Sequence, residues 1–306
     1  MKNFRKEIIS AVLMVFLILN ATSQSTRSSV TESDVKIEKK AKKNKKKKYK
    51  LPKIDLSNWK VTVPINKDNG KPLEVGPPEI SNYATNKALM PYMYNDSTKA
   101  GGLVFYAYPT NSTTANTKYS RSELREQMVP GKNSVNWTFK QGGNMKGKLA
   151  IEDISKDKNG KHHKTIVMQI HGRLTNEQRD LIGAKDNNAP PMLKIYWQDG
   201  KIRVKTKVLK LIKLSGTTLL HEEAWDNDKG FTFEQEVGFR KFILEVKVSE
   251  GKMVVVLNNN EFKVYENIHM EKWGIFENYF KAGNYFQSRD EGSFAKVKFF
   301  ELNVSH

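Results

Sequence analysis

Alternation of polar and apolar residues in many short segments is the feature that most restricts how this chain can fold. It is clear in Trp59–Val63, Leu103–Tyr108 and Lys201–Val208, and it recurs in Phe242–Val248 and Met253–Leu257. Side chains alternate between the two faces of a strand, so each segment predicts a strand with one buried face. Turn pairs such as Asn-Gly and Asp-Gly separate several of them. The pattern predicts an all-β fold, an antiparallel β-sandwich or jelly roll.

Residues 1–24 have the order expected of a signal peptide. Three basic residues within the first six precede the apolar run Ile8–Leu19, and small and polar residues follow it. The run has the length of a signal segment and is short for a membrane span, although an uncleaved anchor is the alternative. We therefore expect a secreted protein, extracellular or periplasmic after cleavage.

Residues 25–50 are rich in Ser and Thr and then in Lys, which predicts a solvated linker. An electrostatic tether to an anionic polymer or cell surface is the alternative. Residues 51–306 show no internal repeat and no second low-complexity break, so we expect one domain there. One or two short helices are expected, with a position near Thr175–Leu181.

The net charge of +19 indicates a polyanionic partner. Residues 1–50 carry about half of it, so the remaining domain is basic as well. Nucleic acid, anionic membrane and acidic polysaccharide are the candidates, and secretion speaks against nucleic acid. The absence of cysteine excludes disulfides, thiolate metal sites and cysteine nucleophiles.

The segment Tyr119–Glu126 places charged residues on one face of a predicted strand. Arg121, Glu123 and Arg125 project together, with Ser122 and Leu124 on the other face. A solvated strand face is the simpler interpretation. The alternative is a binding surface on which Glu123 holds both guanidinium groups, since Arg suits bidentate binding of a carboxylate.

The segment Thr165–Gly172 reads as a central strand because it is largely apolar. The face toward the site is expected to carry Val167, Gln169 and His171, and the core face is expected to carry Ile166, Met168 and Ile170. A lone histidine is more often structural than catalytic. The neighbouring Gln raises the weight of a catalytic role, because His is the commonest acid–base side chain.

The segment Tyr279–Gln287 gives a third polar-faced strand. Its polar face carries Tyr279, Lys281, Tyr285 and Gln287, and its apolar face carries Phe280, Ala282 and Phe286. On the polar face, Gly283 leaves room for a ligand or for another backbone. An ordinary amphipathic edge strand is the simpler interpretation.

Together these segments resemble the three signature blocks of the family 7 polysaccharide lyases, the alginate lyases. The matching stretches are Arg121-Ser-Glu-Leu-Arg125, Gln169-Ile-His171 and Tyr279-Phe-Lys-Ala-Gly-Asn-Tyr-Phe-Gln287, in the family's order. Leu56–Pro64 also resembles the start of such domains. The resemblance implies a β-jelly roll with an open concave cleft. It also implies cleavage of the 1,4-linked mannuronate and guluronate polymer by β-elimination, which leaves an unsaturated uronate at the new non-reducing end.

The resemblance also implies roles for individual residues. The implied catalytic residues are Arg121, Gln169, His171 and Tyr285, and the implied substrate-binding residues are Glu123, Arg125, Lys281, Tyr279 and Gln287. For Glu123, Arg125 and Lys281 the alternative is to support residues that contact the substrate. Arg121 and Gln169 would neutralise the uronate carboxylate. His171 would be the base for guluronate and Tyr285 the acid, with Tyr285 serving as both for mannuronate. Lys281 or Arg125 is expected to lower the pKa of the Tyr285 phenol for that second role.

No cofactor or metal is required by this scheme, although a structural calcium ion is left open. Alginate is the expected partner, with no nucleic acid, no stable membrane insertion and a monomeric chain. A non-catalytic binding module for acidic polysaccharide, a lyase of another uronan and a heparin-like or nucleic-acid binder are the alternatives.

Overall fold

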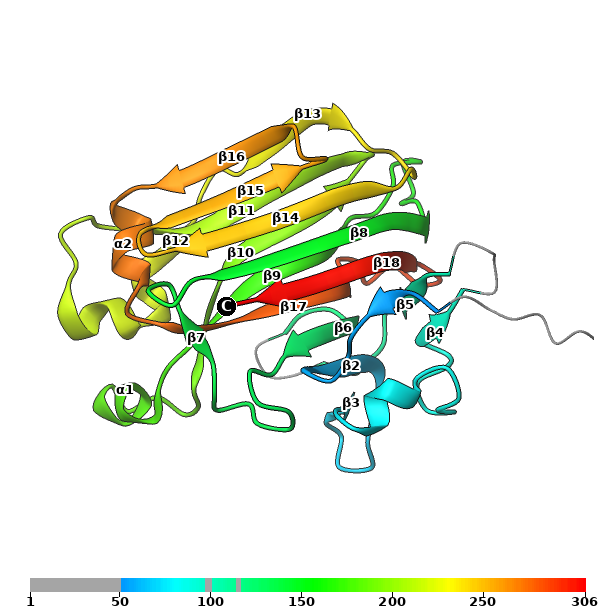
Figure 1. The fold of residues 1–306 in the computed structure, drawn as a ribbon, viewed down its shortest axis with the longest axis horizontal. Helices are drawn as coiled ribbons and strands as arrows, with labels where there is room; N and C mark the ends of the chain where they lie inside the picture. The colour runs from blue at the N-terminus through cyan, green and yellow to red at the C-terminus, as the bar shows by residue number, and fades with distance from the viewer. Residues whose placement is uncertain (1–50, 97–100, 114–116) are drawn as a thin grey trace, which may run out of the picture. The chain divides into compact units, whose positions relative to one another are not determined.

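Two β-sheets account for almost all regular structure in the computed structural model, which describes residues 51–96, 101–113 and 117–306. The expected signal peptide and the expected linker lie outside the described residues. Figure 1 shows the two sheets as stacked layers, with α1 (Asn176–Leu181) and α2 (Ile268–Trp273) beside them. Paired strands run antiparallel, apart from β1, which is parallel to β18. This confirms the predicted antiparallel sandwich.

The first sheet has eight strands. In spatial order these are β16 (Glu261–Glu266), β15 (Lys252–Leu257), β14 (Phe242–Ser249), β8 (Gly143–Ile154), β18 (Ala295–Ser305), β5 (Leu103–Ala107) and β4 (Met93–Asn95), with β1 (Lys53–Ile54) beside β18.

The second sheet has ten strands and carries the residues singled out from the sequence. In spatial order these are β12 (Trp225–Asn227), β11 (Lys201–Leu209), β10 (Asn188–Gln198), β9 (Thr165–Arg173), β17 (Glu277–Phe286), β6 (Arg121–Glu126), β2 (Trp59–Asn66) and β3 (Pro72–Val75), with β13 (Phe231–Glu236) beside β11 and β7 (Trp137–Thr138) beside β17. Short 3₁₀ helices are η1 (Glu79–Asn82), η2 (Gly216–Leu220) and η3 (Glu222–Ala224).

The core fills the space between the sheets with the apolar faces of their strands. Phe280, Ala282 and Phe286 of β17 are buried there, as the sequence predicts. On the first sheet, Phe105 and Phe299 meet edge to face, with ring centres 5.7 Å apart. Burial of such large apolar surfaces is the main stabilising contribution.

One polar side chain connects the two layers inside this core. Asn284 of β17 is fully buried, and its Nδ2 donates to the carbonyls of Phe105 and Ala295 in the first sheet. Its Oδ1 accepts from the hydroxyl of Thr165 on β9. A buried amide must be hydrogen-bonded to be tolerated. Here the two bonds to Phe105 and Ala295 also fix the position of β17 against the first sheet.

The expected helix near residue 175 is present as α1. Thr175 caps it: its hydroxyl accepts from the Gln178 backbone, and the Gln178 side chain accepts from the Thr175 N–H in return. The second helix, α2, agrees with the expected number of one or two short helices. Its position was not predicted, because its six residues carry too few turns for a helical period to show.

The predicted face assignment in β9 is wrong at one pair of residues. Ile166 lines the outer side of the sheet, and Val167 belongs to the core. The pairing register shifts between Ile195 and Tyr196 of β10, where β9 holds one extra residue. A bulge of this kind places two successive residues on one side, which a strict period of two cannot foresee.

Within the described ranges, no helix combines the length and the apolar character needed to cross a membrane.

Candidate active site

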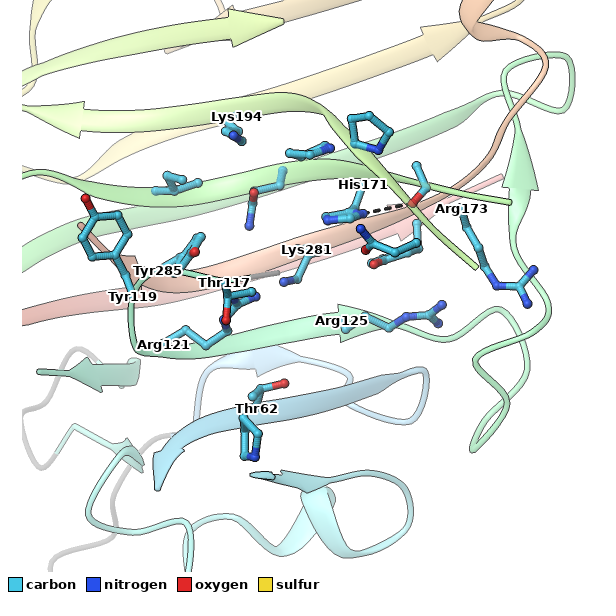
Figure 2. A pocket seen from close by; sticks show the side chains of 18 of the residues that line it. Thr62, Thr117, Tyr119, Arg121, Arg125, His171, Arg173, Lys194, Lys281 and Tyr285 are labelled. Carbon is cyan, nitrogen blue, oxygen red and sulfur yellow. Dashed lines mark hydrogen bonds between the residues drawn. The ribbon is translucent and has the colours of Figure 1, made fainter. Parts of the chain in front are cut away.

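A cleft of about 780 Å³ lies on the outer side of the second sheet. Its floor is built from β2, β6, β17, β9 and β10, and Figure 2 shows the side chains that project into it. The pairing register sets five polar residues side by side across these strands, in the order Lys60, Arg125, Lys281, Gln169 and Lys194. The cleft thus has a transverse row of polar side chains, mostly cationic, along its floor.

Glu123 lies beneath this floor and is 1% exposed. Its carboxylate is 2.5 Å from the Lys281 ammonium and 3.5 Å from Arg121 Nη1, and it accepts a hydrogen bond from the Gln169 amide. It is absent from the cleft lining, so its position fits the supporting role and not the direct substrate contact, the two roles left open by the sequence. Glu123 instead orients three groups that do reach the cleft.

Arg125 is held differently from Arg121. Its guanidinium donates to the carbonyls of Glu126 and Asn133 and to the Asn136 side chain, and it lies 4.1 Å from the centre of the Tyr279 ring. Glu123 therefore anchors Arg121 alone among the two arginines, since the described residues contain no Glu123–Arg125 ion pair. The expectation that Glu123 holds both guanidinium groups was half right.

His171 is fixed in one orientation by the ring beside it and by its own backbone. It stacks on Tyr279 at 5.2 Å with an interplanar angle of 12°. Its Nδ1 is 3.0 Å from the Gly172 carbonyl, an oxygen that can only accept, so Nδ1 carries the proton. Burial, helped by the charge of Lys281, lowers the pKa of His171 to about 3. The neutral ring thus presents Nε2 as a free base.

Tyr285 is the second titratable group of the cleft and lies over Arg121. The Arg121 guanidinium is 4.1 Å from its ring centre, and the Tyr119 ring meets it at 6.4 Å. Burial raises the pKa of Tyr285, while Arg121 and the backbone of Lys118 and Tyr119 act in the opposite direction. The phenol is accordingly protonated in the free protein. Arg121, rather than the Lys281 or Arg125 expected from the sequence, is the cation that favours its phenolate.

Arg121 also carries an unused donor. Its Nη2 is buried and has no hydrogen-bond partner among the described residues. An unsatisfied buried donor is costly, and a ligand oxygen would satisfy it. Figure 2 shows Arg121, Lys281, His171 and Tyr285 around the same hollow.

All the residues named from the sequence, apart from Glu123, line this one cleft. Sequence reasoning missed several others, among them Lys60, Asn133, Arg173 and Lys194. Lys60 lies in Leu56–Pro64, a stretch whose resemblance assigned no role to that residue, and the other three lie outside the motifs named from the sequence. Strand pairing brings Lys60, Arg173 and Lys194 to the site, and Asn133 reaches it from the segment between β6 and β7.

Comparison with known proteins agrees with this geometry. A family model described as alginate lyase matches residues 54–306. A Klebsiella pneumoniae alginate lyase is 24% identical over 299 residues, which covers 83% of this chain and 90% of that protein.

Solved structures show the same fold. Alginate lyase A1-II′, a member of polysaccharide lyase family 7, is 30% identical with a TM-score of 0.62, over 83% of this chain and 96% of that one. A variant of it in complex with a GGG product is 28% identical with a TM-score of 0.65 and the same coverage. A Pseudomonas aeruginosa alginate lyase matches in fold at 22% identity and a TM-score of 0.60, over 83% of this chain and all of that one. The chain belongs to the alginate lyase family, polysaccharide lyase family 7.

Proposed function

We propose that this chain cleaves alginate by β-elimination in the cleft of the second sheet, with Arg121, Gln169, His171 and Tyr285 as its catalytic residues. In this reaction a base removes the proton at C5 of a uronate and the C4–oxygen bond breaks. An acid then protonates the departing oxygen, and a C4=C5 double bond remains. The observation that carries the assignment is a neutral histidine base and a protonated tyrosine in one cationic cleft.

The first requirement is to neutralise the carboxylate next to C5, because its negative charge opposes removal of the proton. Arg121 offers the unpartnered Nη2 donor, and Gln169 has one amide hydrogen beyond the one that Glu123 accepts. Both groups are held in place before substrate arrives. Preorganised donors of this kind stabilise the charge that spreads onto the carboxylate in the transition state.

For guluronate, His171 is the base and Tyr285 the acid. The Gly172 carbonyl holds the proton on Nδ1, which leaves Nε2 able to accept the C5 proton. The raised pKa of Tyr285 keeps its proton available for the leaving oxygen. The protonation states of the free protein are those that this route needs.

For mannuronate, Tyr285 acts as both base and acid, and it must first lose its proton. Arg121 and the backbone of Lys118 and Tyr119 favour the phenolate, and a bound substrate that excludes water changes the balance further. The mannuronate route starts from the less populated protonation state. We therefore propose that guluronate-containing stretches are the better substrate.

Known complexes of a relative support these roles. A variant of A1-II′ in which a tyrosine is replaced was solved in complex with a GGG product. A variant in which both a histidine and a tyrosine are replaced was solved in complex with a GGMG substrate. Loss of those two residue types is compatible with binding of oligosaccharide in that protein. Here His171 and Tyr285 are the histidine and tyrosine of the signature blocks.

The test is the ultraviolet absorbance of the conjugated double bond during incubation with alginate. The wild type should give a rising signal, and Tyr285→Phe should lower kcat by about a hundredfold to ten-thousandfold while still binding alginate. Tyr94→Phe, on the first sheet, is the matched control and should behave as the wild type. Activity retained in Tyr285→Phe would overturn its assignment.

No rise in absorbance with the wild type would favour one of two other functions, a lyase of another uronan or a non-catalytic binding module. A panel of uronans then separates them: elimination on another polymer indicates a lyase of that uronan, and binding without elimination indicates a non-catalytic module.

We also propose that the chain is exported and acts as a monomer on alginate, without nucleic acid and without stable membrane insertion. The basic and then apolar order of residues 1–24 supports export. Mass spectrometry of the protein recovered outside the cytoplasm tests this export. Cleavage near residue 24 should give a chain that lacks the mass of the leading segment. Light scattering of that material gives the oligomeric state.

A further inference from the structure

Most cations on one side of the cleft have an acidic partner within the protein. Lys60 is 2.7 Å from Glu74, Lys281 is 2.5 Å from Glu123, and Arg173 is 2.6 Å from Glu277. These side chains are fixed by internal ion pairs. Their charges are largely balanced before any substrate binds.

Three lysines on the opposite side lack such partners. Lys194 of β10 and Lys205 and Lys207 of β11 form no ion pair and no side-chain hydrogen bond with any other described residue. Lys207 is only 7% exposed. Glu222 of η3 acts on both Lys194 and Lys207, and Asp226 of β12 acts on Lys207, but neither acid forms an ion pair with these lysines. The cluster therefore keeps a net positive charge.

The register places this cluster on the cleft side of the sheet. Lys194 pairs directly with Lys205, so both project from the same face, and Lys207 follows Lys205 by one strand period. Lys194 and Glu222 line the cleft itself. Figure 2 shows Lys194 on the strand beyond the one that carries His171. Two strand spacings, about 10 Å, separate the Lys194 position from that of Lys281.

An unpaired and partly buried ammonium group is energetically unfavourable. Burial, with the charges of Lys207 and Lys205, lowers the pKa of Lys194 to about 8, and burial also lowers the pKa of Lys207. A buried cation is normally paired or replaced by an apolar residue. An anion bound in the cleft would compensate the unfavourable charge, and the proposed substrate carries a carboxylate on every sugar.

We propose that Lys194, supported by Lys205 and Lys207, forms a second anion-binding subsite that takes a uronate carboxylate remote from the cleaved linkage. The inference rests on the proposed lyase function and extends it to substrate length. The chain of substrate crosses the strands along the polar row, from the catalytic centre on β6, β17 and β9 to β10 and β11. The subsite makes the enzyme favour long uronate chains over short ones.

The experiment compares kinetics on polyguluronate with kinetics on the shortest oligoguluronate that the wild type cleaves. In Lys194→Gln we expect KM for the polymer to rise about tenfold, which corresponds to about 1.4 kcal/mol, with kcat changed less than about twofold. KM for the short substrate should stay within about twofold, since it gains little from a remote contact.

Lys158→Gln is the matched control, because it removes the same charge from an exposed turn outside the cleft lining. It should leave both KM values unchanged. An equal KM increase for polymer and short substrate in Lys194→Gln, or no increase beyond that of the control, would overturn the subsite. An inactive wild type on every uronan would instead overturn the proposed function, so the two failures are distinguishable.

A second variant separates binding from structure. Lys207→Met removes a buried unpaired charge, so we expect its melting temperature to rise while KM for the polymer also rises. If Lys207 instead stabilises the fold, the melting temperature of Lys207→Met should fall. A lower melting temperature, or an unchanged polymer KM, would remove Lys207 from the subsite.

Discussion

The role of each charged residue in this cleft depends on which partner it has inside the protein. Glu123 looks like a substrate contact in the sequence, yet it is buried under Arg121, Lys281 and Gln169. Its charge also raises the pKa of Lys281, which burial lowers to about 8. A single carboxylate thus sets both the position and the charge of the groups that meet the uronate.

Replacing Glu123 by Gln keeps the shape of the side chain and removes its charge. We expect a loss of stability of about 3–5 kcal/mol, because the buried Lys281 and the partly buried Arg121 lose their counter-charge. We also expect kcat to fall at least about tenfold, since Arg121 and Gln169 lose their anchor. Without Glu123 the pKa of Lys281 falls further, so the alkaline limit of activity should move to lower pH. Thermal unfolding and a pH–rate profile measure these effects.

Glu74→Gln supplies the comparison at the edge of the same cleft. Glu74 pairs with Lys60 and its side chain is 44% exposed, so its loss should cost no more than about 1 kcal/mol. Similar stability losses in the two variants would show that burial does not distinguish the two carboxylates.

A glycine determines how closely two elements, β17 and β6, can approach. The sequence left open whether Gly283 makes room for a ligand or for a backbone. A Cβ at Gly283 would lie 2.8 Å from the Ser122 carbonyl oxygen and 2.9 Å from the Glu123 Cα, and φ at Gly283 is +138°. The neighbouring strand therefore explains the glycine, which lies in the regular β17–β6 register that pairs Tyr285 with Arg121.

Gly283→Ala should accordingly disturb the pairing of β17 with β6. We expect a destabilisation of about 1–3 kcal/mol from the strained backbone alone, with more from the clash. Gly160→Ala is a suitable control, since φ there is also positive at +77° but no atom lies within 4 Å of the added Cβ. Denaturant unfolding should rank Gly283→Ala as clearly less stable than Gly160→Ala; equal losses would contradict a backbone clash.

Local periodicity was sufficient to find elements but insufficient to arrange them. The alternation in Lys201–Val208 corresponds to β11, and the polar and apolar faces of Tyr279–Gln287 are those found in β17. The reversal at Ile166 and Val167 escaped prediction because a bulge depends on the partner strands. Lys194 escaped it for a related reason: its place beside Gln169 follows from pairing between distant segments, which local sequence does not encode.

At the scale of the whole molecule, the distribution of charge should control how the enzyme finds its polymer. Residues 51–306 carry about half of the +19 net charge, and most of the charged residues that line the cleft are cationic. Long-range attraction of this kind is screened over about 10 Å at about 0.1 M salt. We therefore expect kcat/KM on polymeric alginate to fall steeply as salt rises, with kcat nearly constant and a weaker fall for short oligomers.

The same measurement decides between the two interpretations of the lysine-rich segment 25–50. A simple spacer predicts that a chain beginning at Leu51 has the same salt dependence as the mature protein, and we expect that result. An electrostatic tether predicts a shallower dependence after truncation, because the removed lysines would have been holding the polymer. Rates that do not change with salt in either form would show that the basic domain does not steer its substrate. Sucrose at matched viscosity controls for slower diffusion.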